Sequence, residues 1–206
     1  MIYEVRTYRL KPRTMPGFIE AFGEAYEYRK EFSPLSAFFY SEIGPLNQVI
    51  HIWPYENAAE RDRIRGEAAA PGKWPPQAPE KPVHMESEVF VPFPFIDKFA
   101  SGNIGPIFEW RSYSIAPGLM PGLIEGWEAA YEGRAKLSPV VMAMHTEHGE
   151  LNKFVHIWAY ESLNQRQEVR AAAIETGVWP PAGTPKGAIV AQENKILFAA
   201  PFSPVQ

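Results

Sequence analysis

Hydrophobic and polar residues alternate over residues 2–10, "IYEVRTYRL", which is the pattern of a β-strand with two different faces. The period then changes, because residues 15–29 place Phe18, Phe22 and Tyr26 four positions apart. That spacing puts the three aromatic rings on one side of a helix. The chain is therefore expected to begin with a strand followed by an amphipathic helix.

Two more strand patterns follow, at about 35–43 and 49–56, and a Gly-Pro pair separates them. This arrangement predicts a β-hairpin. A second helix is expected to begin after Asn57, because Asn57 and Glu60 have the spacing of a capping box. A last strand is expected around 83–91. The order β-α-β-β-α-β is that of a ferredoxin-like unit.

The whole pattern then occurs a second time. Residues 2–76 align without a gap on residues 107–181, and 32 of the 75 pairs are identical. A duplication of this length predicts two similar units, for which we expect the boundaries 1–92 and 107–206 with a linker at 93–106. One four-stranded sheet with helices on one side leaves its other side bare. The expected fold is therefore α+β, with two tandem ferredoxin-like units packed sheet to sheet as an intrachain α/β barrel.

The alternation along each strand also predicts which side chains lie on each face of the sheet. Ile50 and Ile52 suit the side of the sheet under the helices, which assigns the intervening polar and aromatic side chains to the space between the sheets. A cavity with this lining would suit a small polar or aromatic molecule. Tyr40 is replaced by His145 in the second unit, which adds a titratable group there and favours that end of the cavity. The candidate ligand-pocket residues are Glu4, Arg6, Tyr8, His51, Trp53, Tyr55, Glu109, Arg111, Tyr113, His145, His156, Trp158 and Tyr160.

Three kinds of function remain open for these residues. In the first, the side chains form a hydrogen-bond network that only specifies packing. In the second they bind a ligand, and in the third they catalyse a reaction, for which no catalytic residue is assigned.

The second helix of each unit carries two arginines one helical turn apart, Arg61 and Arg65 in the first unit and Arg166 and Arg170 in the second. These arginines are expected to be solvated, with anion binding as the alternative. Trp74 and Trp179 are expected to anchor a loop over the core.

Composition narrows the class of protein. The 206 residues are 46% hydrophobic and 21% charged, as in soluble globular proteins, and no apolar run approaches the ~20 residues of a membrane span. The net charge of −4 argues against a nucleic-acid partner. There is no cysteine, and His145 and His148 lie on opposite faces of a predicted strand, so no metal site and no cofactor is expected. The N-terminus lacks the apolar core of a signal peptide, so a cytoplasmic location without membrane contact is expected.

The E-x-R-x-Y strand, the G-x-L-N turn, the H-I-W-x-Y strand, the Arg-x-x-x-Arg helix and the closing Trp-Pro together resemble the NIPSNAP family. The resemblance covers residues 2–91 and 107–198 and implies a dimeric α/β-barrel fold. Its eukaryotic members are linked to mitochondria and vesicular traffic, which is not expected here without a targeting segment, and the activity of its bacterial members is largely undefined.

The main expectation is thus a NIPSNAP-like protein that binds a small molecule between its sheets, with a possible homo-oligomer built from the fused pseudo-dimer. Relatives at the level of fold include monooxygenases. The first alternative is therefore a cofactor-independent or haem-dependent monooxygenase acting on an aromatic substrate, with His51 or His156 as base or ligand. The second alternative is a non-catalytic structural or assembly module.

Overall fold

The computed structural model describes all 206 residues, with eight strands and four helices. The first half comprises β1 (Ile2–Arg9), α1 (Met15–Arg29), β2 (Ala37–Ile43), β3 (Gln48–Tyr55), α2 (Ala58–Ala68) and β4 (His84–Pro92). The second half comprises β5 (Ile107–Ile115), α3 (Met120–Ala135), β6 (Val140–His148), β7 (Lys153–Tyr160), α4 (Leu163–Glu175) and β8 (Ile189–Ala199). Each half has the β-α-β-β-α-β order that the sequence predicts.

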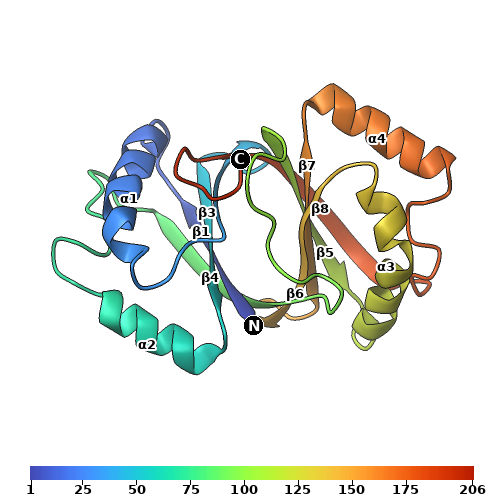
Figure 1. Ribbon diagram of the computed structural model, residues 1–206, viewed down its shortest axis with the longest axis horizontal. Helices are drawn as coiled ribbons and strands as arrows, with labels where there is room; N and C mark the ends of the chain where they lie inside the picture. The colour runs from blue at the N-terminus through green and yellow to red at the C-terminus, as the bar shows by residue number, and fades with distance from the viewer.

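The eight strands form one closed barrel in the order β1-β3-β2-β8-β5-β7-β6-β4. The last strand of each half joins the two sheets, because β4 pairs with β6 and β8 pairs with β2. Helices α1 and α2 cover one outer side of the barrel, and α3 and α4 cover the opposite side (Figure 1). The expected fold class, two ferredoxin-like units forming an intrachain α/β barrel, is confirmed.

One end of the barrel interior is apolar. Phe39 of β2 and Phe108 of β5 come from different halves, and the centroids of their rings lie 4.8 Å apart. Tyr3, Val5 and Ile52 are buried in the same core cluster. A closed barrel of eight strands has an interior that side chains can fill, and it leaves no sheet face for water to reach inside. This end of the barrel interior is therefore filled by side-chain packing, whereas charged side chains that include Glu88, Lys153 and Lys195 lie toward its other end.

This arrangement contradicts the expected placement of the candidate residues. His51, Trp53 and Tyr55 point toward the helices and not into the space between the sheets: His51 contacts Phe22 of α1, and Trp53 contacts Tyr26 of α1. The physical reason is that α1 packs the rings of Phe18, Phe22 and Tyr26 against this face. Helix α2 adds two arginines that bind the buried carboxylate of Glu4. The aliphatic face lines the barrel instead, and the polar aromatic face meets the helices.

A capping box begins the second helix of each half, as the sequence predicts. The Asn57 side chain accepts a hydrogen bond from the backbone N–H of Glu60 (3.0 Å), and the Glu60 carboxylate accepts one from the backbone N–H of Glu56 (2.6 Å). Ser162 and Gln165 make the same arrangement before α4. These caps satisfy N–H groups that the first turn of a helix leaves without partners.

The segment 93–106 runs between the halves and packs on both. Phe93 stacks on Phe154 of β7 at 4.8 Å, and Phe99 contacts Tyr3 of β1 at 5.9 Å.

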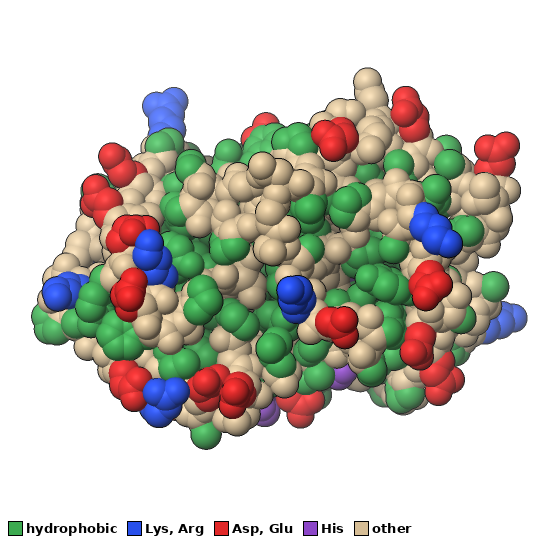
Figure 2. Space-filling view, viewed as in Figure 1, with side chains coloured by type: hydrophobic (Ala, Val, Ile, Leu, Met, Phe, Trp, Pro, Cys, Tyr) green, Lys and Arg blue, Asp and Glu red, His purple; other side chains and the backbone are tan.

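No helix of the structure is long and apolar enough to cross a membrane. Acidic and basic side chains are interspersed over the face seen in Figure 2.

Candidate functional site

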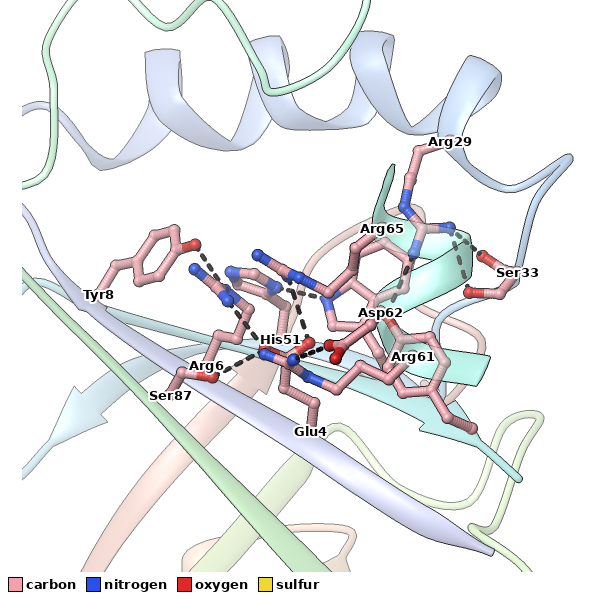
Figure 3. A network of polar contacts seen from close by, with 12 residues as sticks. Glu4, Arg6, Tyr8, Arg29, Ser33, His51, Arg61, Asp62, Arg65 and Ser87 are labelled. Atoms are coloured by element: carbon pink, nitrogen blue, oxygen red, sulfur yellow. Dashed lines mark hydrogen bonds and ion pairs between the residues drawn. The ribbon is translucent and has the colours of Figure 1, made fainter. Parts of the chain in front are cut away.

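A buried carboxylate lies at the centre of the polar network of the first half. Glu4 of β1 is 0% exposed and accepts hydrogen bonds from Arg6 (2.8 Å), Arg61 (2.7 Å) and Ser87 (2.7 Å). Arg65, one turn further along α2, reaches the other carboxylate oxygen at 3.3 Å. The three guanidinium groups therefore converge on Glu4 from the strand and from the helix above it (Figure 3).

The second half repeats this network. Glu109 is also 0% exposed and accepts hydrogen bonds from Arg111 (2.7 Å), from Arg166 of α4 and from Asn194 (3.0 Å). Arg170 lies 3.8 Å from the second carboxylate oxygen. The arginine pair of the second helix, expected to be solvated, instead reaches the buried carboxylate in both halves and is only partly exposed.

The surroundings hold both carboxylates in the charged form. Burial alone raises the pKa of Glu4, but the hydrogen bonds from Arg61 and Ser87 and the charge of Arg6 outweigh it and lower the pKa to about 2. The pKa of Glu109 is likewise lowered to about 2, against the effect of burial, by Arg166, Asn194 and Arg111. Each carboxylate is thus a permanent negative charge that neutralises part of the surrounding positive charge.

A hydrogen bond between neighbouring side chains of β3 fixes the state of His51. The Trp53 indole N–H donates to His51 Nδ1 at 2.7 Å, and because an indole can only donate, this nitrogen carries no proton. Burial and the charge of Arg6 lower the pKa of His51 well below its usual value, so the ring is neutral and its proton is on Nε2. Trp158 makes the same bond to His156 at 2.6 Å. Neither Nε2 has a hydrogen-bond partner.

Arg29 of α1 closes the network on the helix side. Its guanidinium lies 4.4 Å from the centre of the Trp53 ring and donates hydrogen bonds to Ser33 and to the Tyr55 hydroxyl. Arg134 has the equivalent contacts with Trp158, Ser138 and Tyr160. The two arginines are therefore packed and paired inside the protein, as their position on the apolar side of the helix indicates.

A cavity of about 450 Å³ opens beside this network in the first half. Its apolar wall comes from α1, from β4 and from the loop after α2. Its polar wall comes from the candidate residues on β1 and β3, together with arginines of α1 and α2. The lining residues are Arg6, Tyr8, Phe18, Phe22, Arg29, His51, Trp53, Tyr55, Arg65, Ala69, Trp74, Pro75, Pro76, Lys81, Pro82 and Met85.

The equivalent space in the second half is more closely packed. Trp127 replaces Phe22, and its ring lies 4.5 Å from Trp179, whereas Phe22 lies 5.3 Å from Trp74. Gly126, where the first half has Ala21, lets the loop approach α3 so closely that a Cβ there would lie 2.7 Å from the backbone of that loop. The second half therefore repeats the polar network of the first but encloses it differently.

The structure brings the candidate residues together in two clusters, one under each helix pair, and not between the sheets as expected. His145 is the exception, because it bonds only to the carbonyl oxygen of Thr146 and lies on a shallow depression with Met120 and Ile124. Sequence reasoning missed the wall formed by Phe18, Phe22 and Met85, whose apolar side chains alone gave no sign of a pocket. No group of three or more His, Asp or Glu side chains could hold a metal ion.

The closed barrel of two fused ferredoxin-like units, with one arginine-carboxylate network under each helix pair, defines a tandem α/β-barrel protein. The sequence model of the NIPSNAP family matches residues 3–97 and again residues 108–204. The chain therefore belongs to the NIPSNAP family. Human NipSnap homolog 3B is 30% identical over 212 residues, which cover 99% of this chain and 85% of that protein. The NipSnap homolog of Dictyostelium discoideum is 28% identical and covers 86% of this chain.

Solved structures agree with the architecture. A candidate monooxygenase from Fusobacterium nucleatum aligns over 97% of this chain and 92% of its own, with a TM-score of 0.60 and 12% identity. One from Lactobacillus acidophilus aligns over 98% of this chain and 97% of its own, with a TM-score of 0.61 and 8% identity. At these identities the likeness shows the fold alone.

The carboxylate network predicts a dependence of stability on pH. A pKa of about 2 in the folded protein, against 4.5 for an ordinary glutamate, contributes about 3 kcal/mol per carboxylate at neutral pH. Because the folded pKa is depressed, this contribution is present above pH 4.5 and is lost as the pH falls toward 2. Glu4→Gln should therefore cost about 3–5 kcal/mol at pH 7, where it leaves buried arginines unpaired, and much less at pH 2.5.

Urea unfolding of the wild-type protein and of Glu4→Gln at both pH values measures this difference. Glu56→Gln is the matched control, because Glu56 is exposed. An equal loss of stability at pH 7 and pH 2.5 would contradict the charged, buried state of Glu4.

The close approach at Gly126 predicts a second effect. Gly126→Ala should destabilise the protein by about 1–3 kcal/mol, because the added methyl group meets loop backbone that cannot rotate away. Gly66→Ala in α2 meets nothing within 4 Å and should stabilise the protein by up to about 1 kcal/mol through helix propensity. Thermal unfolding of both variants tests the packing of this loop, and a stabilising Gly126→Ala would show that the loop is not held there.

Proposed function

We propose that the protein binds a small molecule with an apolar, aromatic body in the cavity between β1, β3 and the helices of the first half. The single observation that carries the proposal is the cavity itself, with aromatic walls and a buried, unpartnered His51 N–H. A volume of about 450 Å³ lies in the range of small-molecule sites, which are typically about 300–1,000 Å³. A buried polar group without a partner is costly, and a ligand that accepts its hydrogen bond would remove that cost.

The walls of the cavity favour a flat ligand. Phe22 and Trp74 meet edge to face at 5.3 Å, and Trp53 and Trp74 at 5.8 Å, so several ring faces and edges border the same space. Aromatic side chains stack with planar ligands at little cost in conformational entropy. Pro75 and Pro76 give the loop side of the cavity a stiff apolar surface.

A monooxygenase mechanism with His51 or His156 as base is not favoured. Nδ1 accepts the tryptophan N–H, so the other ring nitrogen, Nε2, carries the proton in both histidines. The group therefore donates a hydrogen bond and does not remove a proton. The same bond disfavours haem ligation, because a coordinating histidine normally donates its other N–H, whereas here that nitrogen accepts.

Calorimetric titration with three naphthalene probes tests the binding proposal: 1-naphthaleneacetate, 1-naphthaleneethanol and 1-naphthaleneethylamine. At least one probe should bind with one site per chain. Ala69→Trp should weaken that binding at least tenfold, because Ala69 is exposed at the cavity and an indole there would fill part of it.

Ile174→Trp is the matched control, since Ile174 occupies the equivalent position of the second half and is 65% exposed. The control should bind like the wild-type protein. The proposal fails if none of the three probes binds, or if both tryptophan variants bind equally well.

A further inference from the structure

The charged side chains that line the cavity all have the same sign. Arg6, Arg29, Arg65 and Lys81 border it, and no aspartate or glutamate does. The protein as a whole has a net charge of −4, so this concentration of positive charge is local. Glu4, behind the wall, offsets one of the four charges and leaves a net charge of about +3 around the cavity.

The free hydrogen-bonding groups of the polar wall are all donors. His51 is 1% exposed, and its Nε2–H has no partner within the protein. The Tyr8 oxygen accepts a hydrogen bond from Arg6 Nε at 2.7 Å, which leaves the Tyr8 hydroxyl hydrogen free to donate. Arg6 uses its Nε and one terminal nitrogen for Tyr8 and Glu4, and its other terminal nitrogen makes no bond to the protein. A ligand therefore meets donors and must supply acceptors.

Arg65 is the least tightly bound of the three arginines around Glu4. Its contact with Glu4 is the longest of the three arginine contacts, at 3.3 Å, and its side chain is 39% exposed. Glu4 keeps Arg6 and Arg61 as partners if Arg65 turns toward a ligand. Lys81 is exposed on the loop side of the cavity. Positive charge thus extends from the buried wall to the mouth.

We propose that the ligand of this cavity is an organic carboxylate, with its apolar body against Phe18, Phe22 and Trp74 and its carboxylate facing His51, Arg6 and Arg65. This inference rests on the proposed binding function and adds the charge and orientation of the ligand. A carboxylate supplies several acceptor sites, matches the planar guanidinium group, and needs no donor of its own. A cation would meet repulsion, and a neutral alcohol would satisfy only part of the wall.

The second half gives an internal comparison. His156 has the same unpartnered Nε2, but the ring of Trp127 lies 4.7 Å from its ring, and Trp127 also packs on Trp179. Phe22 lies 5.0 Å from His51 in the first half, so the larger indole of Trp127 takes up more of the equivalent space in the second. Carboxylate binding is accordingly assigned to the first half, with one site per chain.

The three naphthalene probes separate this inference from the binding proposal, because they share one ring system and differ in charge. At pH 7.5 and low salt, 1-naphthaleneacetate should bind at least tenfold more tightly than 1-naphthaleneethanol, and 1-naphthaleneethylamine should bind most weakly. Arg65→Gln should weaken acetate binding about tenfold and leave ethanol binding within twofold. Arg170→Gln, its equivalent in the second half, should change neither.

The outcomes are distinct. If the alcohol binds as tightly as the acetate, or if Arg65→Gln and Arg170→Gln have the same effect, the carboxylate inference is wrong while small-molecule binding stands. If no probe binds, both proposals fall together. Circular dichroism of each variant confirms that a loss of binding does not come from unfolding.

Discussion

The structure depends on the need to neutralise one buried carboxylate in each half. Glu4 and Glu109 are fully buried on the first strand of their units, where an unpaired charge would cost several kcal/mol. Partners on the same strand are not enough, so the second helix of each unit contributes two arginines. This requirement ties the helix to the strand and decides which face of the sheet the helices cover. The opposite face, which carries Val5, Ile50 and Ile52, is then left to line the barrel.

The same constraint accounts for the chemistry of the helix-facing layer. The positive charge that gathers around each carboxylate acts with burial to keep the nearby histidine neutral, and the neighbouring tryptophan fixes which nitrogen holds the proton. The result is a wall of donors without acceptors. Both halves share it, so the network by itself has a structural role. The proposed binding requires in addition the space beside Phe22, which the larger Trp127 reduces in the second half.

Much of the fold could be predicted from the sequence. The hydrophobic period of two or 3.6 residues identifies the strands and helices, and the gapless repeat shows that the same order of elements occurs twice. The direction of the polar face could not. Alternation shows that Ile50 and Ile52 share one face and His51 and Trp53 the other, but it does not say which face is inside a barrel. The arginine pair of α2 carries the missing information, because Arg61 and Arg65 bind Glu4 and are not solvated as expected. The location of the cavity depends on single replacements such as Phe22 by Trp127, whose consequence appears only once the loop and helix are in place.

The central claim is that the ligand site lies on the helix-facing side of the first sheet and not inside the barrel. A crystal structure of the protein soaked with 1-naphthaleneacetate tests it most directly. The account predicts density for one probe per chain, with its rings between Phe22 and Trp74 and a carboxylate oxygen within hydrogen-bonding distance of His51 Nε2. Density inside the barrel or beside His156, or an empty first-half cavity at saturating probe, would contradict it.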